Sequence, residues 1–204
     1  LTTRSGSHSL RAAKAANRLA SALYVAAPTK TNAILEAVAI LQYEKLNKGI
    51  SLPLDYTTML QRQSLNDEQK QNFKNLDFLE SVFETVLDQG YVPATIGAAE
   101  MLHQTGITGG EGMLLITRRG ADTHPLVEAM QHQDRRVRLA ACKAVLGLAE
   151  TVPYAGASVV IDALRYLAAA QGNPRVLIAD RRVSRRQSLA SLIKSAGYVP
   201  DVYS

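Results

Sequence analysis

Glu100 and His103 are the residues whose types and spacing come nearest to a metal site in this sequence of 204 residues. A carboxylate and an imidazole three residues apart share one face of a helix, and two such pairs with additional carboxylates form a di-iron centre. The sequence contains no second copy of the pair. We therefore expect Glu100 and His103 to be solvated or packing residues, and we expect no metal ion and no cofactor.

The spacing of the other reactive residues also argues against an enzyme. His124 and His132 flank a short helical segment, but neither the HExxH spacing nor a Cys/His cluster accompanies them. The segment 106–112 is rich in glycine, yet it lacks the lysine and hydroxyl residue of a phosphate-binding loop. No nucleophile elbow of the G-x-S-x-G type occurs. We predict a non-catalytic protein.

Most of the net positive charge of the sequence comes from arginines near the C-terminus. Residues 175–204 account for +4 of the net charge of +5, which leaves the rest of the chain too balanced to predict a face that binds polyanions. The candidate basic interaction patch consists of Arg181, Arg182, Arg185 and Arg186. No aromatic residue is interleaved with these arginines for base stacking, so a solvated helix start is the favoured interpretation and nucleic-acid binding is an alternative.

The elements that must position these residues are mainly helical. Apolar residues recur at three- and four-residue spacing in 10–26 and 32–47, which predicts a helical hairpin. A third helix is predicted over 66–88, with Asn66 or Asp67 as its cap. The glycine-rich region 106–123 is predicted to be a loop with a short strand or a turn of helix.

Two segments, 79–103 and 122–146, match at a shift of 43 residues. Seven apolar positions coincide, namely Phe83 with Leu126, Val86 with Ala129, Leu87 with Met130, Ala94 with Val137, Ile96 with Leu139, Ala98 with Ala141, and Leu102 with Val145. Each segment is predicted to be a helix, a turn and a second, alanine-rich helix. A period of about 40–47 residues built from paired helices is typical of stacked helical arrays.

The run Asp-Arg-Arg-Val-Arg-Leu-Ala-Ala at 134–141 resembles the second helix of a HEAT repeat. The resemblance extends over about residues 66–170 and implies an α-solenoid of stacked helical pairs. It also implies that Asp134 and Arg138 belong to a polar ladder between successive repeats. The upstream copy has Tyr91 and Thr95 at the ladder positions, so the same ladder is not expected there.

The pattern changes at residue 172. Residues 176–179 are apolar and predict a strand buried on both faces, 184–196 predict an amphipathic helix, and a second strand is expected to open at 198–199. The residues of that helix expected to face inward are Leu189, Leu192 and Ile193.

This tail is similar to the first strand and first helix of a response-regulator receiver domain. In that family, two adjacent acids after the first strand help to bind Mg²⁺. Asp180 matches the first acid, but Arg181 stands at the second position, where a cation opposes metal binding. The resemblance implies a degenerate receiver; a receiver still competent for phosphorylation is the alternative, and it requires acids that this segment lacks.

We predict a mainly α protein in four parts. They are an N-terminal helical hairpin at 1–52 that is similar to a tetratricopeptide unit, a connector at 53–65, HEAT-like repeats at 66–171, and the start of a receiver-like α/β domain at 172–204. A lone strand leaves backbone groups unpaired, so we expect the natural chain to continue the sheet or the strand to pair with another chain.

The expected role is an interaction scaffold with a protein or peptide partner, and with homodimerisation through the tail. Cys142 is the single cysteine, which excludes a disulfide within the chain and suits a reducing cytoplasm. No apolar run approaches the ~20 residues of a membrane span, so no membrane association is expected.

Overall fold

The structure is a computed structural model whose contacts divide the chain into two compact units, Leu1–Leu164 and Arg165–Ser204. The described residues are 2–50, 52–54, 60–61, 65–109, 116–117, 122–148, 154–169, 175–180 and 182–203. Unit 1 is helical, and unit 2 contains a small parallel sheet of two strands. The prediction of a mainly α protein with a C-terminal strand and helix is confirmed at this level. The predicted domain boundaries at residues 53, 66 and 172 remain predictions.

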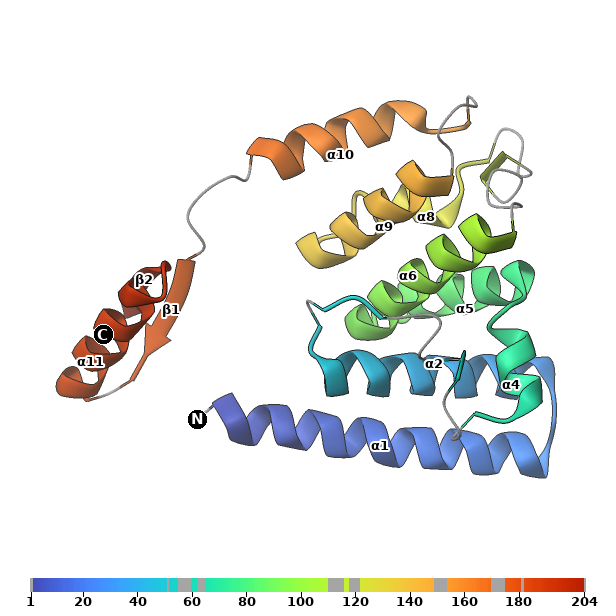
Figure 1. The fold of residues 1–204 in the computed structure, drawn as a ribbon, viewed down its shortest axis with the longest axis horizontal. Helices are drawn as coiled ribbons and strands as arrows, with labels where there is room; N and C mark the ends of the chain where they lie inside the picture. The colour runs from blue at the N-terminus through green and yellow to red at the C-terminus, as the bar shows by residue number, and fades with distance from the viewer. Residues whose placement is uncertain are drawn as a thin grey trace. The chain divides into compact units, whose positions relative to one another are not determined.

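Unit 1 is built from pairs of helices that pack on one another (Figure 1). The pairs are α1 (Thr2–Ala26) with α2 (Lys30–Lys48), α5 (Leu76–Asp88) with α6 (Val92–Gly109), and α8 (Pro125–Ala129) with α9 (Arg135–Leu148). The second helices also touch, because α2 contacts α6 and α6 contacts α9. The short helix α4 (Asp67–Asn72) precedes α5, and α10 (Ala157–Ala169) follows α9 in the chain.

The internal repeat coincides with the helix boundaries. Helix α6 begins at Val92 and α9 begins at Arg135, which is the predicted shift of 43 residues. Both members are buried in the matched pairs Phe83 and Leu126, Val86 and Ala129, Ala94 and Val137, Ala98 and Ala141, and Leu102 and Val145. Leu139 differs from its counterpart: it is 43% exposed, whereas Ile96 is 3% exposed. A core position in one helical pair is therefore a surface position in the next.

The single helix predicted over 66–88 is two helices, α4 and α5. Asn66 caps α4, and its side chain and that of Gln69 form a reciprocal capping box. Asn75 then caps α5 by accepting a hydrogen bond from the N–H of Phe78 at 3.1 Å. Phe73 ends α4 and is 1% exposed. The break between the two helices lets Phe73 enter the core. Asn75, as a second capping residue, stabilises the new helix start.

The loop predicted after residue 105 begins later than expected. Helix α6 continues through Gly106 to Gly109. The Thr105 hydroxyl donates to the carbonyl of Phe73 at 3.3 Å in the interior. Glycine is less favourable than alanine in a helix by about 1 kcal/mol per residue. Packing of this helical turn against the end of α4 outweighs that cost.

Unit 2 consists of β1 (Arg175–Ala179), α11 (Val183–Ser195) and β2 (Val199–Tyr203). The strands are parallel, and Leu177 lies opposite Asp201 in their register. Ile178 is 4% exposed but Leu177 is 64% exposed, so β1 is buried on one face and not on both as predicted. Leu189 and Leu192 of α11 are also exposed, which contradicts the predicted inward stripe.

Candidate functional site

An apolar groove of about 600 Å³ lies between α1 and α2. Alanines of α1 at four-residue spacing, including Ala12, Ala16 and Ala20, form part of its wall and leave space beside their small side chains. Four large side chains of the lining are exposed to solvent: Leu19, Leu23, Leu35 and Tyr91, with Leu19 the most exposed at 72%. This groove is the first candidate for a functional site.

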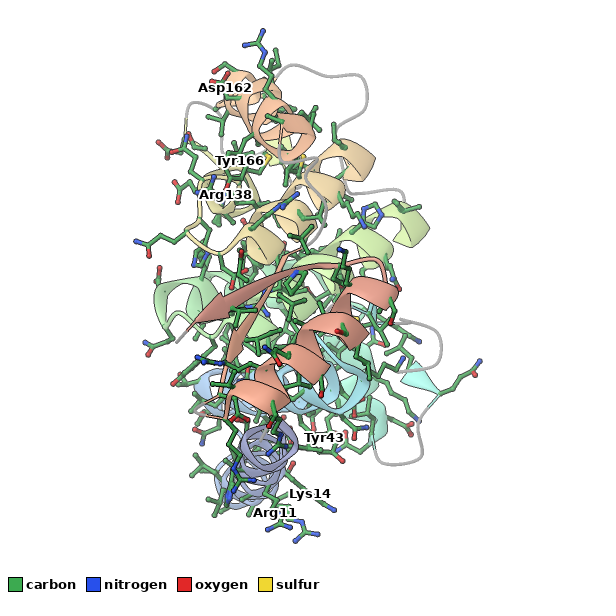
Figure 2. The ribbon with its side chains drawn as sticks, turned by 90° about the vertical axis from the view of Figure 1, so that its left-hand side faces the viewer. Arg11, Lys14, Tyr43, Arg138, Asp162 and Tyr166 are labelled. Atoms are coloured by element: carbon green, nitrogen blue, oxygen red, sulfur yellow. The ribbon has the colours of Figure 1, made fainter. Side chains whose placement is uncertain are left out.

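All charged side chains of α1 are basic. The first 35 residues contain five basic residues and no acidic residue. Figure 2 shows the side chains of Arg11 and Lys14 projecting from α1 on the side away from α2. Helix α1 therefore combines an apolar side at the groove with a positively charged outer side.

A second groove, of about 270 Å³, lies between α6 and α9. Ile96, Glu100, His103 and Gln104 line it from α6, and Arg136, Leu139, Ala140, Lys143 and Ala144 line it from α9. Spacings of three and four residues place each set on one face of its helix. Two residues from the segment after α2, Ile50 and Pro53, complete the lining.

Glu100 is held in this groove by a lysine that is fully buried. The Nζ atom of Lys45 lies 3.0 Å from Oε1 and 3.1 Å from Oε2 of Glu100, and it also donates to the carbonyl of Leu52 at 2.7 Å. The N–H of Leu54 donates to Glu100 Oε2 at 2.9 Å. The two charges neutralise each other and fix residues 52–54 against α6. Glu100 is therefore an ion-paired residue, with a partner that the sequence did not predict.

His103, the other half of that motif, faces α9. A Cβ atom added to Gly147 would lie 2.1 Å from Cε1 of His103, so the imidazole ring occupies the space that the missing side chain leaves. The Nδ1 atom of His103 is buried and has no hydrogen-bond partner among the residues that the structure describes. Glu100 and His103 thus contact different neighbours although they lie on one helix face.

Asp134 and Arg138 lie at the turn that leads into α9. The Asp134 carboxylate accepts hydrogen bonds from the backbone N–H of Arg136 at 2.8 Å, from its Nε at 3.0 Å and from its Nη2 at 2.6 Å. The bonds from the Arg136 side chain are the main reason that the pKa of Asp134 falls from 3.8 to about 2. Arg138, labelled in Figure 2, donates from Nε to the carbonyl of His132. These bonds close the turn; the ladder between repeats remains a prediction.

A buried pair to which the sequence analysis assigned no role joins α5 to α8. The side chains of His124 and Glu80 are 0% and 6% exposed, and Nε2 of His124 lies 3.2 Å from Oε1 of Glu80. The Nδ1 atom accepts a hydrogen bond from the N–H of Leu126 at 3.1 Å, so His124 caps α8. A helix start was detectable from the sequence, because Pro125 is favoured at the first helical position. The partner Glu80 was not detectable.

The residues predicted in the tail surround the start of α11. Asp180 accepts a hydrogen bond from the N–H of Arg182 at 2.9 Å and pairs with Nε of Arg185 at 3.5 Å. Arg182 and Arg185 are exposed and Arg186 is half-buried. Arg181 lies outside the described residues. The structure thus brings Asp180 together with two arginines of the proposed basic patch, Arg182 through its backbone and Arg185 through its side chain.

Within the described ranges, no group of three or more His, Cys, Asp or Glu residues is arranged to hold a metal ion. A search of the same part of the chain finds no helix whose length and hydropathy would let it cross a membrane.

Comparison with known proteins finds no matching family model, no similar curated protein and no similar solved structure.

Proposed function

We propose that this chain is a non-catalytic protein-interaction scaffold, built from stacked helical pairs of the HEAT kind and followed by a degenerate receiver-like unit. The apolar groove between α1 and α2 carries the proposal. The 43-residue shift between α6 and α9 supports the repeat architecture. The pairing of Asp180 with Arg185 supports a receiver-like unit without phosphoryl chemistry, because the single matching acid already has a cationic partner.

The occupant of the groove is an amphipathic helix of a partner protein. Two adjacent helices present a furrow into which the side-chain ridge of a third helix packs, and such recognition uses apolar anchors at three- and four-residue spacing. Leu19 and Leu23 stand four residues apart and are exposed, so they can contact successive anchors of the partner.

Charge selects an acidic partner over a second copy of the chain. The first 35 residues hold five basic and no acidic residues, so two copies joined through α1 would bring like charges together. Glutamates beside the apolar stripe of a partner helix would instead be attracted to α1 within a Debye length of about 10 Å.

The test is a fluorescence anisotropy titration with a labelled peptide of about 20 residues, long enough to form a helix. The peptide carries leucines at three- and four-residue spacing and glutamates elsewhere, and a second peptide replaces every glutamate with lysine. The proteins are the full chain, Leu19→Ser/Leu23→Ser, and Val25→Ser as the matched control. Val25 lies on the same helix and is 80% exposed, but it does not line the groove.

We expect the acidic peptide to bind and the double substitution to weaken it about tenfold or more, which corresponds to 1.4 kcal/mol. Val25→Ser should bind like the unmodified chain. Equal affinity for both peptides, or no effect of the double substitution, would refute the proposal. A light-scattering mass near twice 22.1 kDa that the double substitution abolishes would assign the groove to self-association instead.

A further inference from the structure

We propose that the groove between α6 and α9 binds an extended acidic peptide segment. A carboxylate of the peptide pairs with Lys143, and an apolar side chain of the peptide contacts Leu139. This site is separate from the groove between α1 and α2, and the proposal does not depend on that groove. The proposal rests on two observations. Some charged groups of the lining already have partners, and the remaining lining residues have a spacing that matches an extended peptide.

Most charged groups of the lining are already neutralised. The carboxylate of Glu100 is paired with the buried ammonium of Lys45, and the guanidinium of Arg136 is paired with Asp134. Lys143 is exposed, and within the described part of the chain it forms no ion pair. The lining therefore has a surplus positive charge at Lys143, which favours a ligand with a carboxylate.

The imidazole of His103 supplies a second polar group at the same end of the groove. Its ring contacts Gly147, which lies one helical turn beyond Lys143 on α9. Its Nδ1 atom has no partner among the described residues although it is buried. Because Gly147 encloses Nδ1, His103 adds a polar ring to this end of the groove without offering that atom to a ligand.

Leu139 supplies the apolar contact. Its side chain is 43% exposed, whereas the matched residue Ile96, which also lines the groove, is buried. Four residues separate Leu139 from Lys143, which is about 6 Å along a helix. In an extended peptide, side chains on one face are two residues and about 6.6 Å apart. The spacing therefore fits an apolar residue followed two positions later by aspartate or glutamate.

The size of the groove agrees with an extended segment. Its volume of about 270 Å³ is slightly below the range of about 300–1,000 Å³ that is typical of drug-sized ligands. One or two side chains fill such a space, whereas a helix does not.

The experiment uses the ¹⁵N-labelled full chain and the blocked peptide Gly-Ser-Leu-Gly-Glu-Ser-Gly, followed by amide chemical shifts. A second peptide has glutamine in place of glutamate. Lys143→Gln removes the proposed cation, and Lys74→Gln is the matched control, because Lys74 is also exposed but lines neither groove. Leu19→Ser/Leu23→Ser separates this site from the first groove.

We expect shifts in α6 and α9, and a Kd that rises about two- to fivefold in Lys143→Gln or with the glutamine peptide, as for an exposed ion pair. Lys74→Gln and Leu19→Ser/Leu23→Ser should leave the Kd unchanged. The proposal is overturned if millimolar peptide produces no shifts, if the shifts fall in α1 and α2, or if Lys143→Gln has no effect. Absent shifts, or no effect of Lys143→Gln, would leave the separate test of the acidic helix between α1 and α2 unaffected.

Discussion

At the scale of single residues, unit 1 depends on buried polar side chains that have a partner. The side chains of His124 and Glu80 are 0% and 6% exposed, so each relies on the other and on nearby hydrogen bonds in place of water. In His124→Ala, the carboxylate of Glu80 stays buried without the imidazole. We expect the free energy of unfolding to fall by about 3 kcal/mol, measured by urea denaturation.

Glu80→Gln is the control for this prediction. Glutamine keeps the size of the side chain and carries no charge that requires a partner, so the loss should be clearly smaller than for His124→Ala. If both substitutions lower the free energy of unfolding equally, the pair is not the source of the stability.

Gly147 tests the close approach of α6 and α9. Replacing glycine by alanine inside a helix normally stabilises it by about 1 kcal/mol. Here the new Cβ would lie 2.1 Å from Cε1 of His103, so the ring must move. We expect Gly147→Ala to lower the free energy of unfolding by about 1–3 kcal/mol, as overpacking does. The same change in a His103→Ala background should stabilise, and a loss of equal size in both backgrounds would contradict the contact.

Asp134 makes the stability depend on pH. Its pKa in the folded protein is about 2, below the ordinary value of 3.8. A lowered pKa means that the stabilisation is present above about pH 4 and is lost as the pH falls toward 2. We expect Asp134→Asn to be less stable than the unmodified chain by about 1 kcal/mol at pH 7, and this difference to shrink below pH 4. Urea midpoints that differ equally at pH 7 and pH 3 would contradict this.

At the scale of elements, the pair of Lys45 and Glu100 connects α2, α6 and residues 52–54. Glu100→Gln leaves the fully buried ammonium of Lys45 without its counter-charge, so we expect a loss of about 3–5 kcal/mol in the free energy of unfolding. Lys45→Met/Glu100→Gln removes both charges and should recover most of that loss. Thermal or urea unfolding measures both variants, and a double variant that is less stable than Glu100→Gln would refute the assignment.

The same elements show how much could be predicted from the sequence. Helix periodicity predicted α2 and most of α1, although α1 begins at Thr2 and not at residue 10, and the shift of 43 residues matched the starts of α6 and α9. The break between α4 and α5 was missed, because it depends on the burial of Phe73 in the assembled core. The partner of Glu100 was also missed, since Lys45 lies 55 residues away in the chain. Such contacts leave no local pattern in a single sequence.

The two grooves illustrate the same limit. The alanines of α1 and the stripe of α9 are visible as three- and four-residue spacings. Which of their faces stays exposed depends on the neighbouring helices, and Leu139 shows this because its matched residue Ile96 is buried. The predicted inward residues of α11 were wrong for a similar reason: Leu192 is 67% exposed although the helix pattern is amphipathic.

At the scale of the whole molecule, the proposed scaffold offers two binding surfaces of different chemistry in one helical unit. The groove between α1 and α2 is apolar with positive charge beside it, and the groove between α6 and α9 has a surplus cation beside an exposed leucine. A partner with an acidic amphipathic helix and a separate acidic extended segment could use both. Such bivalent binding gives higher affinity than either contact alone.

The most direct test of the scaffold proposal is amide hydrogen exchange of the full chain with and without the acidic helical peptide, resolved by segment. We predict slower exchange in α1 and α2 when the peptide is bound, unchanged exchange in α9, and no slowing in Leu19→Ser/Leu23→Ser. Unchanged exchange in α1 and α2 at a peptide concentration that saturates binding would contradict the proposal, because the peptide would then bind elsewhere.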